Sequence, residues 1–214
     1  SIGSSICGAA AVLGAEPVVK SQPYKAAVAV STVVIFGTLS MFLYPALFRA
    51  GMLDLTTEQM GLFTGATLHE VAHVVGAGNA MGQAISDPAI IVKMIRVMML
   101  APVLVILSII LSRREAAAGQ AGEKRKITIP WFAFLFLAVI GFNSLHLLPS
   151  GVVSAINSLD TFLLTMAMTA LGAESSFEKF KKAGARPFLL AALLYAWLFF
   201  GGYWLVKGIT AWMA

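Results

Sequence analysis

The apolar stretch 61–78 contains three residues whose side chains and spacing could support chemistry: His69, Glu70 and His73. Their spacing matches H-E-x-x-H, in which one turn of helix brings two histidines together to bind zinc and the glutamate acts as a general base. A zinc protease also needs a third protein ligand and an open position for water, and Asp160 is the candidate ligand. One hypothesis is therefore an intramembrane zinc metalloprotease.

Two basic residues, Lys93 and Arg96, interrupt the apolar stretch 88–111. On a helix they lie about 60° apart and share a face. Exposing Arg96 to lipid would cost on the order of 3 kcal/mol, so the pair needs protein partners. Two interpretations remain open: a structural ion pair with Glu70 or Asp160, and a site that attracts a small anion.

Small polar residues gather in two further places. Asn157, Thr161, Thr165 and Thr169 recur every four residues near Asp160, so they form a polar ridge that faces protein or water. At the start of the chain, glycines and small polar side chains predict a break in a helix, where backbone groups could contact a ligand. The candidate residues at this break are Ser4, Ser5, Cys7 and Gly8.

The composition predicts a membrane protein. Of 214 residues, 59% are hydrophobic and 12% are charged, whereas a soluble domain has roughly 25% charged residues. We expect an all-α, polytopic bundle in which each crossing uses about 20 apolar residues. The predicted crossings are 26–48, 59–78, 88–111, 130–148, 152–172 and 187–206. Cys7 is the single cysteine, which excludes an intrachain disulfide.

The basic residues between the crossings predict the orientation. If all six segments cross, Lys20, Lys25 and Lys207 fall on one side of the membrane, and the more numerous basic residues fall on the other. The positive-inside rule makes the richer side cytoplasmic and places the C-terminus outside. On this side lie Arg49, Arg113, Arg114, Lys124, Arg125, Lys126, Lys179, Lys181, Lys182 and Arg186. Residues 112–129 are then a cytoplasmic loop, and the charge of +5 is no sign of nucleic-acid binding.

A short repeat predicts internal symmetry. The residues Leu-Gly-Ala-Glu occur at 13–16 and again at 171–174, each time at the end of an apolar segment. With an odd number of crossings between them, the second copy is inverted relative to the first, as in many transporters with interrupted, crossing helices. We therefore expect inverted five-helix repeats. Residues 1–48 end the first repeat and 59–206 form the second, within one transmembrane domain, 1–214, that is the C-terminal part of a longer protein.

Several segments together resemble a known family of bacterial membrane proteins. They are 3–11 (GSSICGAAA), 65–78 (GATLHEVAHVVGAG), 92–97 (VKMIRV) and 164–172 (LTMAMTALG). The chain resembles the bacterial sulfate exporter family, whose members are described as conserved hypothetical membrane proteins. This resemblance implies a polytopic inner-membrane protein related in fold to cation/proton antiporters and bile acid symporters. It also implies anion export and leaves the substrate open.

The preferred hypothesis is a secondary transporter, and not an enzyme, that exports a small oxyanion such as sulfate or an organosulfonate and is coupled to an ion or proton gradient. Lys93 and Arg96 supply positive charge in this hypothesis, and His69 with Glu70 carries a coupling proton. The polar ridge and the N-terminal break supply hydrogen bonds, and His73 belongs to the same pathway. No cofactor and no metal are expected. The expected partners are a small anion and the lipid bilayer, and homo-oligomer formation is left open.

Overall fold

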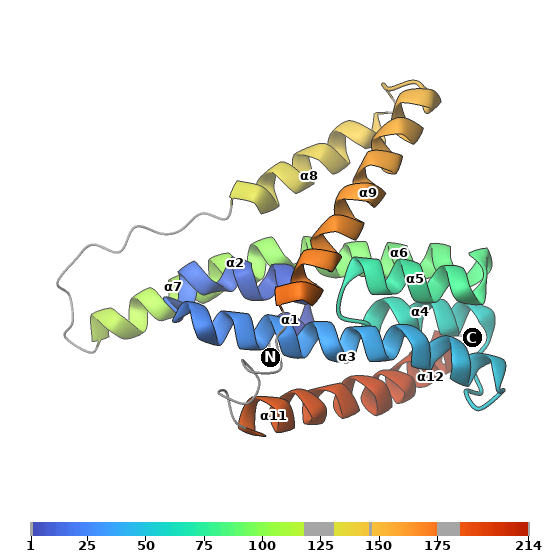
Figure 1. Ribbon diagram of the computed structural model, residues 1–214, viewed down its shortest axis with the longest axis horizontal. Coiled ribbons are helices and arrows are strands. Elements are labelled where there is room, and N and C mark those ends of the chain that lie inside the picture. The colour runs from blue at the N-terminus through green and yellow to red at the C-terminus, as the bar shows by residue number, and fades with distance from the viewer. Residues whose placement is uncertain (1, 118–130, 146, 175–184, 214) are drawn as a thin grey trace.

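The computed structural model describes residues 2–117, 131–145, 147–174 and 185–213, and every regular element in these ranges is helical (Figure 1). The helices are α1 (Ile2–Ser5), α2 (Ala9–Val19), α3 (Pro23–Arg49), α4 (Thr57–Thr67), α5 (Val71–Met81), α6 (Gln83–Met98), α7 (Leu100–Ala117), α8 (Trp131–Ser144), α9 (Ser150–Glu174), α11 (Ala185–Ala196), the π-helical turn η1 (Trp197–Gly201) and α12 (Gly202–Met213). The all-α fold class is therefore confirmed.

Three helical stretches of the described chain are long and apolar enough to cross a membrane. They are Tyr24–Arg49, Gln83–Arg113 and Ala185–Met213, and they coincide with the predicted crossings at 26–48, 88–111 and 187–206. Helices α8 and α9 coincide with the segments predicted at 130–148 and 152–172, but neither is among these three. Figure 1 shows that the ends of α8 and α9 that connect to each other project from the molecule, whereas α9 also contacts α3 and α5, and α8 contacts α6 and α7.

The predicted crossing at 59–78 was wrong. Two helices of 11 residues each, α4 and α5, replace it, and residues 68–70 between them leave the helical conformation. Leu68 and Glu70 have extended backbones, with ψ of 149° and 157°. The H-E-x-x-H residues therefore do not share one helix, because His69 and Glu70 lie in the break and His73 lies on α5.

Helices α4 and α5 form a re-entrant hairpin. A Cβ atom added to Gly61, in the first turns of α4, would lie 2.6 Å from Pro88 Cγ. One added to Gly78, near the end of α5, would lie 2.8 Å from Ser86 Cα. Both ends of the α4–α5 pair thus pack against the start of α6, so the chain enters the molecule along α4 and returns to the same end along α5.

Helices α1 and α2 form a second, shorter hairpin. Residues 6–8 interrupt the helix as predicted, and Gly8 has a φ of 70°, which glycine adopts without steric cost. The Gly8 N–H donates to the Gly3 carbonyl over 2.9 Å, and a Cβ on Gly3 would lie 2.6 Å from Val12 Cγ2. Since Gly3 packs against Val12, the chain reverses direction at 6–8. We call residues 6–8 and 68–70 the two hairpin tips.

The crossings α3 and α11–α12 run in the same direction, side by side in Figure 1. Lys25 and Pro187 line one cavity near their starts, the rings of Phe36 and Tyr195 lie 5.3 Å apart, and Lys207 contacts Asp54 near their ends. The predicted sorting of basic residues was therefore wrong in part. Lys20 and Lys25 lie at the same end as Arg186, and Lys207 lies at the same end as Arg49, because the α4–α5 hairpin does not cross.

A buried aromatic cluster holds the α4–α5 hairpin in place. Tyr44 of α3 and Phe63 of α4 are fully buried, with their rings stacked 4.9 Å apart, and Phe199 packs edge-on against both. The Tyr44 hydroxyl is hydrogen-bonded to Thr67 Oγ1 at 2.9 Å. Because Thr67 is the last residue of α4, this contact fixes the point where the chain enters its tip.

Candidate functional site

The ammonium group of Lys93 lies between the two hairpin tips and is fully buried. It donates to the main-chain carbonyls of Ile6 at 3.0 Å, Leu68 at 2.8 Å and His69 at 2.5 Å. An ammonium group has three N–H donors, and these contacts use all of them. Lys93 therefore binds the carbonyl ends of both interrupted helices and has no donor left for a ligand.

Arg96, one turn further along α6, reinforces the same contact. It donates to the carbonyls of Gly65 at 3.2 Å and Leu68 at 2.9 Å in the α4–α5 hairpin, and to Ser4 at 3.1 Å in the α1–α2 hairpin. A guanidinium group has five N–H donors, so two are left over once the contacts with described residues are counted. The last carbonyls of a helix lack intrahelical donors and carry partial negative charge, which explains why two cations lie here.

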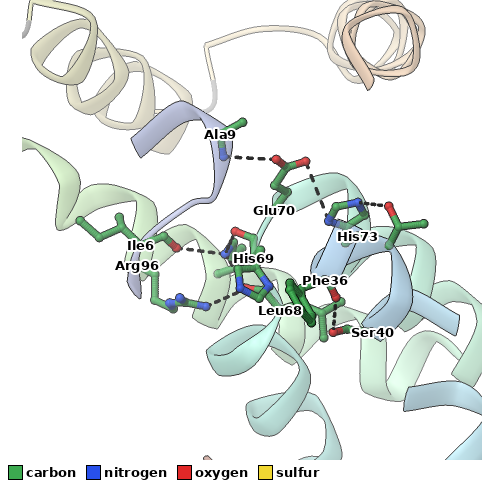
Figure 2. A network of polar contacts seen from close by, with 11 residues as sticks. Ile6, Ala9, Phe36, Ser40, Leu68, His69, Glu70, His73 and Arg96 are labelled. Carbon is green, nitrogen blue, oxygen red and sulfur yellow. Dashed lines mark hydrogen bonds and ion pairs between the residues drawn. The ribbon is translucent and has the colours of Figure 1, made fainter. Parts of the chain in front are cut away.

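The side chain of Glu70 joins the tips on another side. Its Oε1 accepts a hydrogen bond from the N–H of Ala9, the first residue of α2, at 3.2 Å. A Cβ atom at Gly8 would collide with Glu70 Cγ, so the glycine permits the close approach. A carboxylate at a helix N-terminus is electrostatically favourable. Figure 2 shows Glu70 between Ala9 and the ring of His73.

His73 extends this contact toward α3. Its Nδ1 lies 3.8 Å from Glu70 Oε2, and its Nε2 lies 3.3 Å from the hydroxyl of Thr38. Both residues are buried, with 6% of Glu70 and 3% of His73 exposed. The order Ala9, Glu70, His73, Thr38 forms a row of exchangeable protons and acceptors across the tips. It was predicted that His69 would act with Glu70; the structure places His73 next to the carboxylate instead.

Several buried polar atoms in the α4–α5 tip and in the helices next to it have no hydrogen-bond partner in the described chain. They are Thr64 Oγ1, His69 Nδ1, Glu70 Oε2 and His73 Nδ1. Native proteins pair most buried polar groups, and exceptions often mark a functional site. Three of these four atoms belong to titratable side chains that converge on one break, which makes the tips a candidate site for a proton or a small ligand.

A cavity of about 360 Å³ leads to the α1–α2 hairpin from the end that holds Lys25. It lies between α2, α3 and α11, and its polar lining includes Lys25, Tyr24, Thr32 and Ser4, with no acidic side chain among the described residues that line it. Ser4 also accepts the hydrogen bond from Arg96, so the cavity reaches the residues that hold the tips together.

The other residues predicted for the site are placed in different surroundings. Cys7 is buried within the α1–α2 tip, with 6% exposed, whereas Ser5 is exposed and donates to the Ile2 carbonyl at 3.0 Å. Asn157, Asp160, Thr161 and Thr165 are all exposed on α9. The Thr161 and Thr165 hydroxyls donate to carbonyls four residues earlier in α9. The predicted ridge thus satisfies its own hydroxyls and does not join the tips.

The predicted ion pair of Lys93 and Arg96 with Glu70 or Asp160 is not found in the described residues. In the described residues their hydrogen-bond partners are main-chain carbonyls, and neither forms a salt bridge with Glu70 or Asp160. No three His, Cys, Asp or Glu side chains in the described part of the chain are grouped to hold a metal ion. The arrangement that H-E-x-x-H requires is therefore not formed.

Sequence reasoning missed Ala9 and Thr38, which contribute a main-chain donor and a hydroxyl to the row across the tips. Ala9 could not have been identified, because a backbone N–H has no sequence signature. Thr38 lies next to Gly37 in a crossing, where a small residue beside a hydroxyl was the available signal. A Cβ atom at Gly37 would collide with the His73 ring.

Together, the fold and the buried charges define an all-helical membrane protein in which two interrupted helices meet tip to tip. The chain belongs to the family described as conserved hypothetical protein 698, which matches residues 1–191. The family prediction is confirmed at that level. No solved structure matches the chain.

Curated relatives agree with this assignment. A UPF0324 membrane protein of Bacteroides thetaiotaomicron is 65% identical over the whole of this chain, which covers 64% of that protein. The UPF0324 inner membrane protein YeiH of Escherichia coli is 54% identical over 94% of this chain, which covers 57% of YeiH. A UPF0324 membrane protein of Bordetella bronchiseptica is 54% identical over 97% of this chain, which covers 65% of it. The chain thus spans about 60% of the length of these relatives.

Proposed function

We propose that the protein is a secondary transporter that exports a small oxyanion, such as sulfate or an organosulfonate, through the region where the two hairpin tips meet. The observation that carries this proposal is the cavity that reaches Ser4 and the α1–α2 hairpin. Its lining is mostly apolar but has a basic residue, Lys25, and hydroxyl groups at Tyr24, Thr32 and Ser4. None of the described lining residues is a carboxylate, so these residues would not repel an anion. Interrupted helices that meet inside a membrane protein are typical of transporter binding sites.

The distribution of basic residues supports an opening toward the cytoplasm. Among the described residues, Lys20, Lys25, Arg113 and Arg186 lie at the end nearer the cavity, and Arg49 and Lys207 lie at the opposite end. The sequence adds two further basic segments, 124–126 after α7 and 179–182 before α11. By the positive-inside rule the cavity end is cytoplasmic and the C-terminus lies outside. A cytoplasmic opening is what an exporter needs to load its substrate.

The two basic residues of α6 have different roles in this proposal. Lys93 holds the tips together with all of its donors and does not bind the anion. Arg96 is partly exposed, uses three of its five donors, and can offer the remaining two to an oxyanion that has passed Ser4. This refines the sequence-based hypothesis, which assigned both residues to the anion.

The row of Glu70, His73 and Thr38 provides a route for a coupling proton. Within the described residues, Glu70 Oε2 and His73 Nδ1 are both without hydrogen-bond partners, and they lie 3.8 Å apart, so a proton gained by either side chain would draw them together. A histidine ring nitrogen and a carboxylate can each bind and release a proton, which suits a proton carrier. Movement of the proton would change the charge of the Glu70 carboxylate that accepts from the Ala9 N–H, and would thereby change the contact between the tips.

The experiment that tests the proposal measures transport by the full-length protein in proteoliposomes. Vesicles are loaded with ³⁵S-sulfate or a labelled organosulfonate, and efflux is followed with and without a pH gradient. We expect efflux that the Ala29→Phe variant abolishes, because Ala29 lines the cavity. Ala84→Phe, at an exposed position outside the cavity, is the matched control. Equal efflux from empty and protein-containing vesicles for every anion, or full efflux in Ala29→Phe, would refute the proposal.

A further inference from the structure

The contacts of Lys93 resemble the coordination of a metal cation more than an ion pair. Its ammonium nitrogen has three carbonyl oxygens at 2.5–3.0 Å, contributed by Ile6 of one tip and by Leu68 and His69 of the other. The side chain is fully buried, and no carboxylate of the described chain contacts it within 4 Å. Rings of main-chain carbonyls are the groups that replace the hydration shell of K⁺ and Na⁺ in membrane proteins.

The carbonyls belong to positions where transporters commonly bind a coupling cation. Unwound backbone and half-helix C-terminal ends coordinate Na⁺ or H⁺ where two interrupted helices meet. Here the end of α4 and the end of α1 present such carbonyls, and the Lys93 side chain of α6 brings its nitrogen to them. We propose that the Lys93 ammonium occupies a monovalent-cation site between the two tips, so that the native protein binds no alkali cation there and a shortened side chain would allow one to bind.

Lys93 and Arg96 lie close together but contact mostly different carbonyls. Arg96 lies on the same face of α6, Glu70 and His69 lie in the α4–α5 tip, and Cys7 lies in the α1–α2 tip. Arg96 contacts the carbonyls of Gly65, Leu68 and Ser4, and shares only Leu68 with Lys93. The Ile6 and His69 carbonyls therefore lose their cation when Lys93 is shortened, and an alkali ion can take its place.

This inference extends to coupling, and that consequence rests on the proposed function. If the ammonium group replaces a coupling ion, transport by the native protein does not depend on Na⁺ or K⁺ at the tips, and the proton is left as the coupling ion. The cation site itself is independent of transport, because binding stabilises the folded protein whether or not it moves an anion.

The test compares two variants of the full-length protein that remove the charge and differ in the space they leave. Lys93→Ala leaves room for an ion, whereas Lys93→Met fills the same volume with an apolar side chain. The thermal unfolding temperature of each is measured in detergent with NaCl, KCl, methylammonium chloride or choline chloride at equal ionic strength. Lys25→Ala, at an exposed lysine in the cavity, controls for the loss of one positive charge.

We expect Na⁺, K⁺ or methylammonium to stabilise Lys93→Ala relative to choline, by about 3–6 °C for each tenfold excess over the dissociation constant. Lys93→Met, Lys25→Ala and the native protein should show no such difference. If Lys93→Ala is not obtained folded in choline, recovery of monodisperse protein when these cations are present during purification is the equivalent result. The proposal is overturned if none of these cations raises either the stability or the yield of Lys93→Ala, or if the native protein responds equally. Loss of transport with intact cation rescue would refute only the proposed function.

Discussion

The N–H of Ala9 donates to Glu70 Oε1 at 3.2 Å, and this hydrogen bond joins two hairpins that are 61 residues apart in the chain. It places a buried carboxylate at the N-terminus of α2, beside the ring of His73. One side chain therefore links the packing of the tips to a titratable group. Changes at Glu70 should separate the structural contribution of this contact from the contribution of its charge.

Glu70→Gln tests the charge. The amide oxygen can still accept from Ala9, so the free energy of unfolding should change by less than about 1 kcal/mol. Because the amide cannot bind a proton, the pH dependence of anion efflux should flatten while the variant stays folded. Efflux from proteoliposomes between pH 5.5 and 8.5 measures this, with Glu58→Gln at an exposed position of α4 as the control. An unchanged pH profile in Glu70→Gln would remove Glu70 from proton coupling.

Gly8→Ala tests the approach of the two tips. Gly8 and Gly51 both have positive φ, of 70° and 65°, so an alanine at either position is strained, and more so at Gly8, whose ψ of −126° lies outside the left-handed helical region. At Gly51 the new methyl group meets no atom within 4 Å, whereas at Gly8 it collides with Glu70. We expect the free energy of unfolding of Gly8→Ala to be lower than that of Gly51→Ala by about 1–3 kcal/mol. Equal unfolding temperatures would contradict the contact between the tips.

Cysteine labelling tests the re-entrant hairpin. In a Cys7→Ala background, single cysteines replace Gly51, Gly82 and Lys25 in turn, at exposed positions. Since the α4–α5 hairpin returns to its starting side, a membrane-impermeant maleimide added outside the cell should label positions 51 and 82 but not 25. A continuous crossing at 59–78 would put 51 and 82 on opposite sides, and that labelling pattern would contradict the fold.

The contact between Asp54 and Lys207 gives a pH-dependent contribution at the other end of the molecule. The hydrogen bond from Lys207, at 2.5 Å, lowers the pKa of Asp54 below its usual range. Its stabilisation is therefore fully present above the unfolded pKa of about 3.9 and is lost as pH falls through the lower, folded value. The unfolding temperature of Asp54→Asn should be slightly lower than that of the native protein at pH 7, and the two should converge once the pH falls below the folded pKa of Asp54. Because Asp54 is exposed, high salt should reduce the difference.

The sequence by itself determined the helical class, three of the apolar helical stretches long enough to cross a membrane, and the charged and histidine side chains that lie at the two hairpin tips. Apolar runs of about 20 residues with flanking basic groups are sufficient to identify α3, α6–α7 and α11–α12, because lipid requires every backbone group of a crossing to be satisfied within a helix. Intramembrane charge was enough to single out Glu70, His73, Lys93 and Arg96, since such residues need partners. The N-terminal break was also predictable, because Gly8 can adopt a positive φ that other residues disfavour.

Only the tertiary structure decided that 59–78 is a hairpin. Residues 67–70 include neither glycine nor proline, and the stretch has the length and hydrophobicity of a crossing. The α4 helix ends there because Lys93 and Arg96, which follow it by more than 20 residues, take the carbonyls that another helical turn would have used. No local pattern records a hydrogen bond supplied from elsewhere in the chain. For the same physical reason, the end of the molecule at which Lys25 and Lys207 lie and the pairing of Glu70 with Ala9 became known only from the folded chain.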